Sequence, residues 1–277
     1  MDYRNLIYEK QGNIARVTLN RPKKLNAMND ALLTELDAAL DEIEGDDNIK
    51  VVVFKGAGRA FSVGRDMSGM GTSQIDASGI PDDVPGQVSW YQRFQARWYR
   101  IAALAKNTIA QVHGYCLDSG CWLAFACQVC VATEDAQFGE PAIKIGHVTP
   151  FPLWAHIVGL KRAADLLYSG RMISGKEAER IGLVMRAVPS NDLEACVDPI
   201  ANEMASISMD GQIARIEGFQ VGADVFGLGS AWRLFAIAHQ WSLLNPPPET
   251  EVDFYRLREK SGLKAAIRAV DARFTGE

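Results

Sequence analysis

The sequence predicts an α/β protein with a helical C-terminal third, and three observations lead to that prediction. A β-rich run at 14–19, a helical pattern at 32–43 and a continuous apolar run at 49–54 follow one another in the order of a βαβ unit. A second apolar strand, 108–112, precedes a short apolar helix and another strand. From about Asp192 onward the apolar spacing is mainly helical.

The composition is that of an ordinary globular protein. The 277 residues are 48% hydrophobic and 23% charged, which suits one large domain, alone or with an appendage. The net charge is -5 and no long basic run exists, so nucleic acid is not an expected partner. The N-terminal residues lack the basic-then-apolar order of a signal peptide, and we expect a cytoplasmic protein. The most apolar stretch, 109–132, is interrupted by polar residues and glycines, which indicates strand, turn and helix and no membrane span.

Each element has a local signal. The sequence Gln-Gly-Asn at 11–13 predicts a hairpin between runs at 6–8 and 14–19, and Asn29 or Asp30 is suited to cap the first helix. The glycine-rich segment 67–87 predicts a mobile surface loop. After it we expect a helix whose core face carries Tyr91, Phe94, Trp98 and Ile101. Strands are predicted at 129–132 and 184–188, and helices at 153–168 and 254–274. A capping box is expected at Ser174–Glu177 and a hinge at 246–248.

The five cysteines are expected to be reduced thiols, because their number is odd and no export signal is visible. Cys127 and Cys130 have the spacing of half a zinc site. No second pair of cysteines or histidines follows at ligand spacing, so we interpret them as small buried residues and expect no metal.

Two glycine-containing turns after strands are candidates for chemistry. One spans 60–67 and the other spans 114–121. Ligands of α/β sheets lie beyond the carboxyl ends of strands, and N–H groups at a helix start are free to bind negative charge. Two such turns facing each other form an oxyanion hole. The alternative is a pair of ordinary tight turns.

At these turns the sequence resembles the crotonase superfamily, the enoyl-CoA hydratase/isomerase group. The matching segments keep their order and spacing across nearly the whole chain. They are LNRPKKLNA at 19–27, AFSVGRD at 60–66, HGYCLDSGC at 113–121, AQFGEP at 136–141, LYSG at 167–170, the segment 178–184 and a closing helix that ends in Phe274.

The resemblance implies an α/β fold, a crotonase-like spiral of ββα repeats at 1–190 that contains the acyl-CoA site. Residues 191–277 would form a helical oligomerisation region of a homotrimer or a dimer of trimers. The ligand would be a coenzyme A thioester, with no tightly bound cofactor, and its carbonyl oxygen would be held by the N–H groups of Arg65 and Ser119. Matched positions for coenzyme A contact are Lys24, Leu25, Ala27, Ser62, Gly64, Arg65, Asp66, Met67, Leu117 and Lys264.

The sequence departs from the family at both expected glutamates. Trp122 and Ala142 stand in their places, and neither can perform acid–base chemistry. This argues against the standard syn-hydration of a simple 2-enoyl-CoA. The usual Gly-Gly-Gly turn is Asp-Ser-Gly at 118–120. Ser119 is tolerated if its φ is negative, whereas a positive φ there would distort the hole.

Three other side chains are candidates for the proton chemistry. Asp118 lies in the second turn and is either a base or an Asx-turn or helix-cap residue. Glu140 lies two positions before Ala142, on the same face of an extended segment, and is either a substitute acid or a solvated loop carboxylate. His147 is either a proton-transfer group or an ordinary surface or core histidine. Asp66 is expected to cap the segment after the first turn.

The acyl pocket is expected to be reshaped by bulky residues. Trp98, Trp122, Ala142 and Trp154 are its candidate lining, and the two later tryptophans either form a broad aromatic site or simply fill space. Lys24, Lys264 and Arg268 are candidates for phosphate contacts, or ordinary solvated surface.

The leading hypothesis is an acyl-CoA enzyme of the lyase or isomerase type that acts on a bulky, aromatic or cyclic acyl group. Its net reaction would be hydration, isomerisation, C–C cleavage or thioester hydrolysis. One alternative is a non-catalytic acyl-CoA-binding subunit, which the two lost glutamates favour. Another is a ring-opening carbon–carbon hydrolase that acts on a cyclic diketone without coenzyme A.

Overall fold

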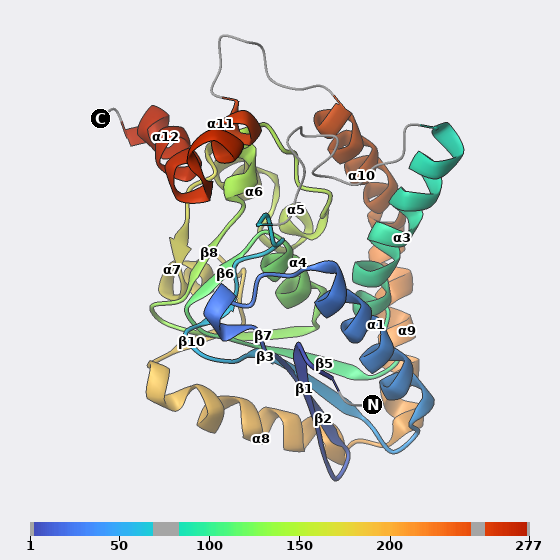
Figure 1. The fold of residues 1–277 in the computed structure, drawn as a ribbon. Coiled ribbons are helices and arrows are strands. Elements are labelled where there is room, and N and C mark those ends of the chain that lie inside the picture. Colours follow the sequence, from blue (N-terminus) through green and yellow to red (C-terminus); the bar gives the residue numbers. More distant parts are fainter. Residues whose placement is uncertain (1–2, 69–82, 245–252, 276–277) are drawn as a thin grey trace.

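The computed structural model describes residues 3–68, 83–244 and 253–275 and contains two sheets (Figure 1). The larger sheet has six strands in the spatial order β1 (Leu6–Gln11), β2 (Ile14–Leu19), β3 (Val51–Gly56), β5 (Asn107–Val112), β7 (Val129–Thr133) and β10 (Arg186–Val188). The smaller sheet has four, in the order β4 (Ala60–Ser62), β6 (Tyr115–Leu117), β8 (Gln137–Gly139) and β9 (Ile173–Ser174).

The chain alternates between the two sheets. Three consecutive strand pairs, β3 and β4, β5 and β6, and β7 and β8, each give one strand to the larger sheet and the next to the smaller one. Strands β2 to β10 of the larger sheet are parallel, as are β4, β6 and β8 of the smaller one. This is the spiral of ββα repeats that was predicted, and it stacks the turns that follow β4 and β6.

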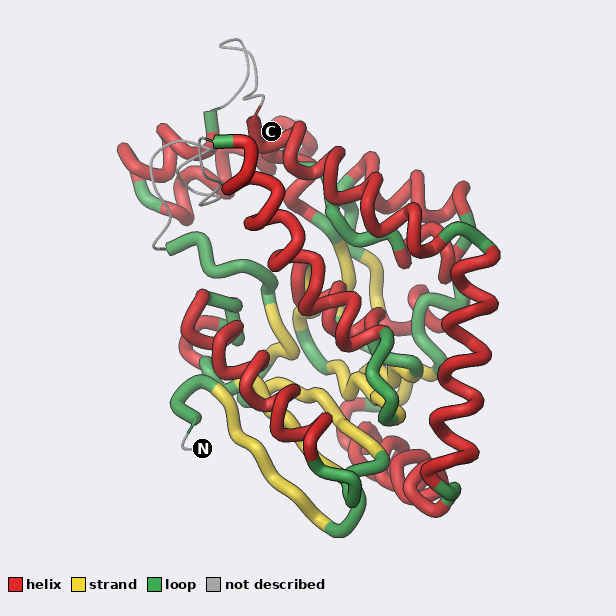
Figure 2. Tube along the Cα trace, turned by 90° about the vertical axis from the view of Figure 1, so that its right-hand side faces the viewer, coloured by secondary structure: helices red, strands yellow, loops and turns green. Residues whose placement is uncertain are grey.

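Helices cover both faces of the larger sheet. The helices of the spiral are α1 (Asp30–Gly45), α3 (Val84–Ala102), α4 (Ser119–Ala126), α5 (Leu153–Val158), α6 (Leu160–Ser169) and α7 (Gly175–Arg180), with short 3-10 helices η1 (Pro22–Lys24), η2 (Pro141–Ile145) and η3 (Ser190–Asp192). The C-terminal helices are α8 (Leu193–Ser206), α9 (Met209–Val225), α10 (Leu228–Leu244), α11 (Phe254–Ser261) and α12 (Leu263–Thr275). Helix α8 packs on one face through Val197 and Ala201, and α1 and α4 lie on the other (Figures 1 and 2).

Local signals in the sequence placed several elements correctly. The hairpin is confirmed, with β1 and β2 antiparallel around Gly12, and the predicted parallel pairing of β2 with β3 is present. The Asn29 side chain accepts a hydrogen bond from the Leu32 N–H at 3.0 Å and caps α1. The Ser174 hydroxyl accepts one from the Glu177 N–H at 3.2 Å and caps α7.

Three predicted elements differ from the structure. The predicted helix at 153–168 is two helices, because Gly159 adopts a φ of 79° and a ψ of 159° between α5 and α6. The predicted final helix is also two helices, broken at Gly262 with a φ of 84°. The predicted loop at 67–87 is too long, because Asp83 caps α3 and the helix starts at Val84.

Some sequence predictions concern residues that the structure does not describe. The proposed hinge at 246–248 and most of the predicted loop lie outside the described residues, as do the side chains of Tyr91 and Phe94. Trp98 and Ile101, from the same helical pattern, are buried as expected.

Within the described residues, no single helix is long and apolar enough to cross a membrane. One bent pair, α9 with the first part of α10, meets that test of length and composition only when its two helices are joined across a 65° bend.

Candidate functional site

The first turn is held in place by the segment that leads into α1. The Met28 N–H donates to the Gly64 carbonyl at 2.7 Å, and the Asp66 N–H donates to the Met28 carbonyl at 2.9 Å. Gly64 has a φ of 86°, and a Cβ there would lie 2.5 Å from the Cβ of Asp118. Glycine is therefore required both by the turn and by the close approach of the second turn.

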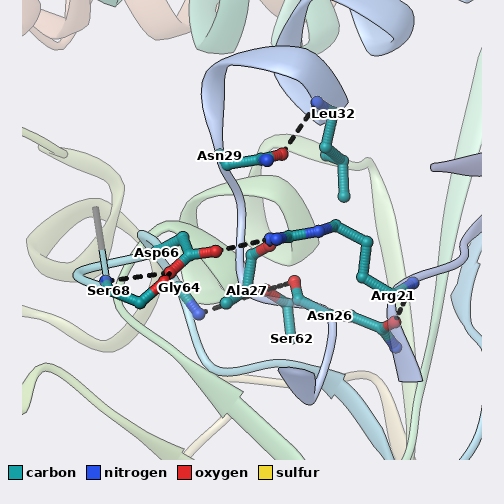
Figure 3. Close-up of polar contacts among 9 residues, drawn as sticks. All are labelled: Arg21, Asn26, Ala27, Asn29, Leu32, Ser62, Gly64, Asp66 and Ser68. Atoms are coloured by element: carbon teal, nitrogen blue, oxygen red, sulfur yellow. Dashed lines mark hydrogen bonds and ion pairs between the residues drawn. The ribbon is translucent and has the colours of Figure 1, made fainter. Parts of the chain in front are cut away.

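Asn26 connects this segment to β4 and to the residue after β3, and Figure 3 shows its contact with Arg21. Its side chain is fully buried and accepts a hydrogen bond from the Arg21 N–H at 2.8 Å. Its amide nitrogen donates to the carbonyls of Ala57 and Ala60 at 2.9 and 2.7 Å. The φ of Asn26 is 54°, a left-handed conformation that asparagine tolerates better than most residues.

Asp66 is locked between a cation and a turn (Figure 3). One carboxylate oxygen pairs with the Arg21 guanidinium at 2.8 Å, and the other accepts from the Ser68 N–H and hydroxyl. Burial opposes ionisation, but the Ser68 hydrogen bonds and Arg21 outweigh it and lower the pKa of Asp66. Asp66 therefore caps the segment that follows, as the sequence predicted.

The second turn carries the backbone strain at Asp118. This residue joins β6 to α4 with a φ of 50° and a ψ of -125°, a conformation that favours glycine. Ser119, the first residue of α4, has no positive φ. The condition for an undistorted N–H donor at Ser119 is therefore met, and the strained position is the one before it.

The Asp118 carboxylate bridges the two turns. Its Oδ2 accepts hydrogen bonds from the Arg65 N–H at 3.1 Å and from the Ser119 hydroxyl at 3.0 Å. It makes no side-chain hydrogen bond that caps α4, so the helix-cap interpretation is wrong. An anionic oxygen thus already occupies one of the two N–H groups that the sequence assigned to the thioester.

Glu140 is a buried acid, and its interpretation as a solvated loop carboxylate is wrong. The residue is 3% exposed and lies directly before η2. Its Oε1 accepts from the indole N–H groups of Trp122 at 2.6 Å and Trp154 at 3.0 Å and from the Thr149 hydroxyl at 3.2 Å. Burial, together with the charge of Asp118, raises the pKa of Glu140 to about 8 despite these three donors.

The tryptophans predicted to line the acyl pocket are buried against other aromatic side chains. Trp122, at a position where the resemblance predicts a glutamate, stacks on Phe151 at 6.5 Å and meets the edge of Trp98 at 5.8 Å. Trp154 packs edge-on against Phe125 at 4.9 Å. All three tryptophans are 4% exposed or less, so they are packed into the core. Ala142, where the resemblance predicts the second glutamate, is half-buried within η2.

His147 is paired with a tyrosine from the C-terminal helices. The Tyr255 hydroxyl lies 2.9 Å from His147 Nε2, and the ring of His239 lies 6.3 Å away. Burial, with smaller effects of His239 and Arg65, lowers the pKa of His147 to about 3. Burial also raises the pKa of Tyr255. Both partners are therefore neutral near pH 7, which suits hydrogen bonding better than proton transfer.

Sequence reasoning missed Tyr255, His239 and Thr149. Tyr255 reaches the site because α11 folds back over the first turn, where Arg258 donates to the Met67 carbonyl at 2.9 Å. Phe254 and Tyr255 pack with Met67 in the same apolar cluster. His239 is one of only four histidines, which was the one available signal, and nothing in the local sequence distinguishes Tyr255.

The proposed coenzyme A residues fall into two groups. Lys24, at the end of η1, and Lys264 and Arg268, on α12, are exposed. Leu25 adopts a φ of 51°, and the buried Ser62 hydroxyl donates to the Asn26 carbonyl at 2.8 Å. These inner residues shape the turn, whereas the three basic residues are available to solvent.

The thiols give no indication of metal chemistry. All five cysteines are unpaired, and four of them are buried, including Cys127 and Cys130. Burial raises the pKa of both of these thiols. In the part of the chain that the structure describes, no three histidines, cysteines or carboxylates are grouped to hold a metal ion.

Comparisons with known proteins agree with the fold and the turns. The model of the family described as enoyl-CoA hydratase/isomerase matches residues 9–214. The short-chain-enoyl-CoA hydratase of Clostridium acetobutylicum is 34% identical over 210 residues, which are 74% of this chain and 77% of that protein. The crystal structure of an enoyl-CoA hydratase/isomerase from Xanthobacter autotrophicus Py2 is 32% identical, covers 99% of both chains and has a TM-score of 0.84. An enoyl-CoA hydratase structure from Mycobacterium smegmatis has a TM-score of 0.86 at 25% identity and covers 99% of this chain and 96% of that one.

A spiral of ββα repeats, with two turns stacked at strand ends, defines the crotonase class of α/β proteins. The match over 206 residues then gives the narrower assignment. The chain belongs to the enoyl-CoA hydratase/isomerase family.

Proposed function

We propose that the chain is an acyl-CoA enzyme that stabilises a thioester enolate or oxyanion with the N–H groups of Arg65 and Ser119. One observation carries the proposal: the Arg65 N–H already holds an anionic oxygen, Oδ2 of Asp118, at 3.1 Å. Ser119 begins α4, where first-turn N–H groups have no intrahelical acceptor. Fixed main-chain donors of this kind stabilise charge that develops on a carbonyl oxygen.

Asp118 has to leave Arg65 before a thioester oxygen can use this donor. Two negative oxygens at one N–H repel each other, so the carboxylate and an enolate oxygen exclude one another there. Its attachment to the same turn keeps the displaced carboxylate beside the acyl carbon next to the carbonyl. Asp118 is therefore our candidate for the base that removes a proton from that carbon.

Glu140 is our candidate for the acid. A pKa of about 8 keeps it mostly protonated near neutrality and close to the range in which proton transfer is efficient. His147 is less suited to this role, because its pKa is about 3 and its Nε2 is paired with Tyr255. Its role in our account is to hold α11 over the site.

The substrate class follows from the losses at Trp122 and Ala142. Without the two family glutamates, we propose an atypical acyl group, bulky, aromatic or cyclic, and a net reaction of isomerisation, C–C cleavage, thioester hydrolysis or an unusual hydration. We also propose a homotrimer or a dimer of trimers. Helices α9 and α10 and the turn between them carry exposed apolar side chains that an assembly would cover, among them Phe219, Val225, Phe226, Leu234 and Trp241.

Mass spectrometry of acyl-CoA thioesters incubated with the protein in heavy water tests the proposal. The panel contains crotonyl, dienoyl, aromatic and cyclic β-keto thioesters. Deuterium uptake next to the carbonyl, gain of water or cleavage supports the proposal. Thioesters that bind and return unchanged favour the non-catalytic subunit. Failure to bind any thioester, with cleavage of a free cyclic diketone, favours the ring-opening hydrolase.

A further inference from the structure

Among the residues that the structure describes, three buried polar atoms around Trp122 have no hydrogen-bond partner. They are Oε2 of Glu140 and the indole nitrogens of Trp98 and Trp232. The three residues are 3%, 2% and 4% exposed. A buried polar group without a partner costs free energy comparable to a lost hydrogen bond, so three in one place call for an explanation.

These atoms belong to one set of touching side chains. Trp98 meets the edge of Trp122 at 5.8 Å, and Trp122 stacks on Phe151 at 6.5 Å. Phe151 in turn meets Trp232 edge-on at 5.3 Å. The Trp122 indole donates to Glu140 Oε1 at 2.6 Å. We refer to Trp98, Trp122, Glu140, Phe151 and Trp232 as the Glu140 cluster.

All three unpartnered atoms are hydrogen-bond donors when Glu140 is protonated. An indole nitrogen can only donate. Glu140 Oε1 already accepts three hydrogen bonds, so a proton on this carboxyl group resides on Oε2. A hydrocarbon acyl chain offers nothing to these donors, whereas an oxygen atom offers an acceptor.

We propose that the acyl group bound here carries a keto oxygen, in addition to its thioester carbonyl, and that the Glu140 cluster receives it. This inference rests on the proposed function, since it describes the acyl part of the same thioester. An uncharged oxygen fits better than a carboxylate, because the donors are themselves uncharged and Asp118 places a negative charge nearby. Trp98 and Trp232 are then specificity-determining residues, and Trp232 comes from the helical C-terminal region.

Calorimetry at pH 7 tests the inference by comparing the binding of hexanoyl-CoA with that of the positional isomers of oxohexanoyl-CoA. We expect one oxo isomer to bind about tenfold more tightly than hexanoyl-CoA, as one added hydrogen bond would give. The variants Trp98→Phe and Trp232→Phe should each reduce that preference, measured against hexanoyl-CoA in the same variant, at least about threefold. Trp241→Phe, an exposed indole on the same helix as Trp232, is the matched control and should leave that preference unchanged.

A second readout uses the unaltered protein, in case a variant fails to fold. The indole N–H resonances of Trp98 and Trp232 should shift with the preferred oxo isomer and not with hexanoyl-CoA. Equal affinities for hexanoyl-CoA and every oxo isomer, or a preference that survives both substitutions, would overturn the inference alone. If no thioester binds at all, the proposed function fails and this inference fails with it.

Discussion

The first turn and the Glu140 cluster differ in how many of their buried polar atoms have hydrogen-bond partners. Around the first turn, Asn26 makes three hydrogen bonds through its side chain, and both oxygens of Asp66 have partners. In the Glu140 cluster, three buried polar atoms have no partner in the described part of the chain. A saturated network fixes geometry, and an unsaturated one leaves donors for a ligand.

The same contrast explains two carboxyl groups of opposite behaviour. Asp66 has a cation and a serine as partners, and its pKa is lowered although burial opposes this. Burial and the charge of Asp118 raise the pKa of Glu140 to about 8, although three neutral donors oppose this. Burial disfavours ionisation of both acids, and only Asp66 has partners strong enough to outweigh it.

The largest effect should follow from removing the charge that bridges the turns. For Asp118→Asn, we expect deuterium exchange next to the thioester carbonyl to fall by about a hundredfold or more, because a positioned base is lost. Mass spectrometry in heavy water measures it. The control is Asp135→Asn, an exposed carboxylate after β7. Unchanged deuterium exchange in Asp118→Asn would show that Asp118 is not the base.

Around the first turn, the largest loss of stability is expected for Asn26→Ala. It removes three hydrogen bonds from a fully buried side chain, which predicts a decrease of about 3 kcal/mol in the free energy of unfolding. Asn29→Ala, the cap of α1, is the graded comparison at about 1 kcal/mol. Urea unfolding measures both, and equal effects would show that the Asn26 network is no more than an ordinary cap.

The buried carboxyl group of Glu140 should make the free energy of unfolding depend on pH. Between about pH 4.5 and 8 the unfolded chain has lost the Glu140 proton and the folded chain keeps it, so this group lowers stability as the pH rises through that window. The variant Glu140→Gln should show a smaller loss of stability over this pH range.

His147 acts in the opposite direction. As the pH falls from 6.5 towards 3 the unfolded histidine gains a proton that the folded one does not, so stability falls.

Unfolding midpoints from pH 4 to 9 measure the pH dependence that Glu140 and His147 each cause. An unchanged slope above pH 5 in Glu140→Gln would mean that the buried acid is ionised.

The smallest effect should come from the contact that closes α11 over the site. Tyr255→Phe removes the hydroxyl paired with His147 and should lower the free energy of unfolding by about 1 kcal/mol. Tyr99→Phe, at a half-exposed tyrosine of α3, is the control and should have little effect. A Tyr255→Phe protein as stable as the parent would show that the hydroxyl contact with His147 does not help to hold α11.

Strong local signals predicted the larger sheet and several helix starts. The hairpin at Gly12 and the caps at Asn29 and Ser174 all follow from short-range chemistry. The smaller sheet has no such signal, because its strands are two or three residues long. The breaks at Gly159 and Gly262 were missed because a glycine within a helical pattern is compatible with either outcome.

In the site, sequence reasoning located the turns, and the assignment of Arg65 and Ser119 as thioester donors, which came from the family resemblance, stays a prediction. Sequence reasoning could not foresee that Asp118 would hold the Arg65 N–H, because the two residues are 53 positions apart. The burial of Glu140 was equally hidden, since it depends on indoles from α4 and α5 that meet only in the fold. The trimeric or hexameric assembly and the coenzyme A contacts of the basic residues stay predictions.

The most direct test of the account is the infrared stretch of a thioester carbonyl, labelled with carbon-13 in butyryl-CoA, when it binds the protein. If the N–H groups of Arg65 and Ser119 hold the oxygen after Asp118 has moved away, the band shifts to lower frequency than in water, and Asp118→Gly strengthens binding. A bound carbonyl with its solution frequency, in both the parent and Asp118→Gly, would contradict the assignment of these two donors.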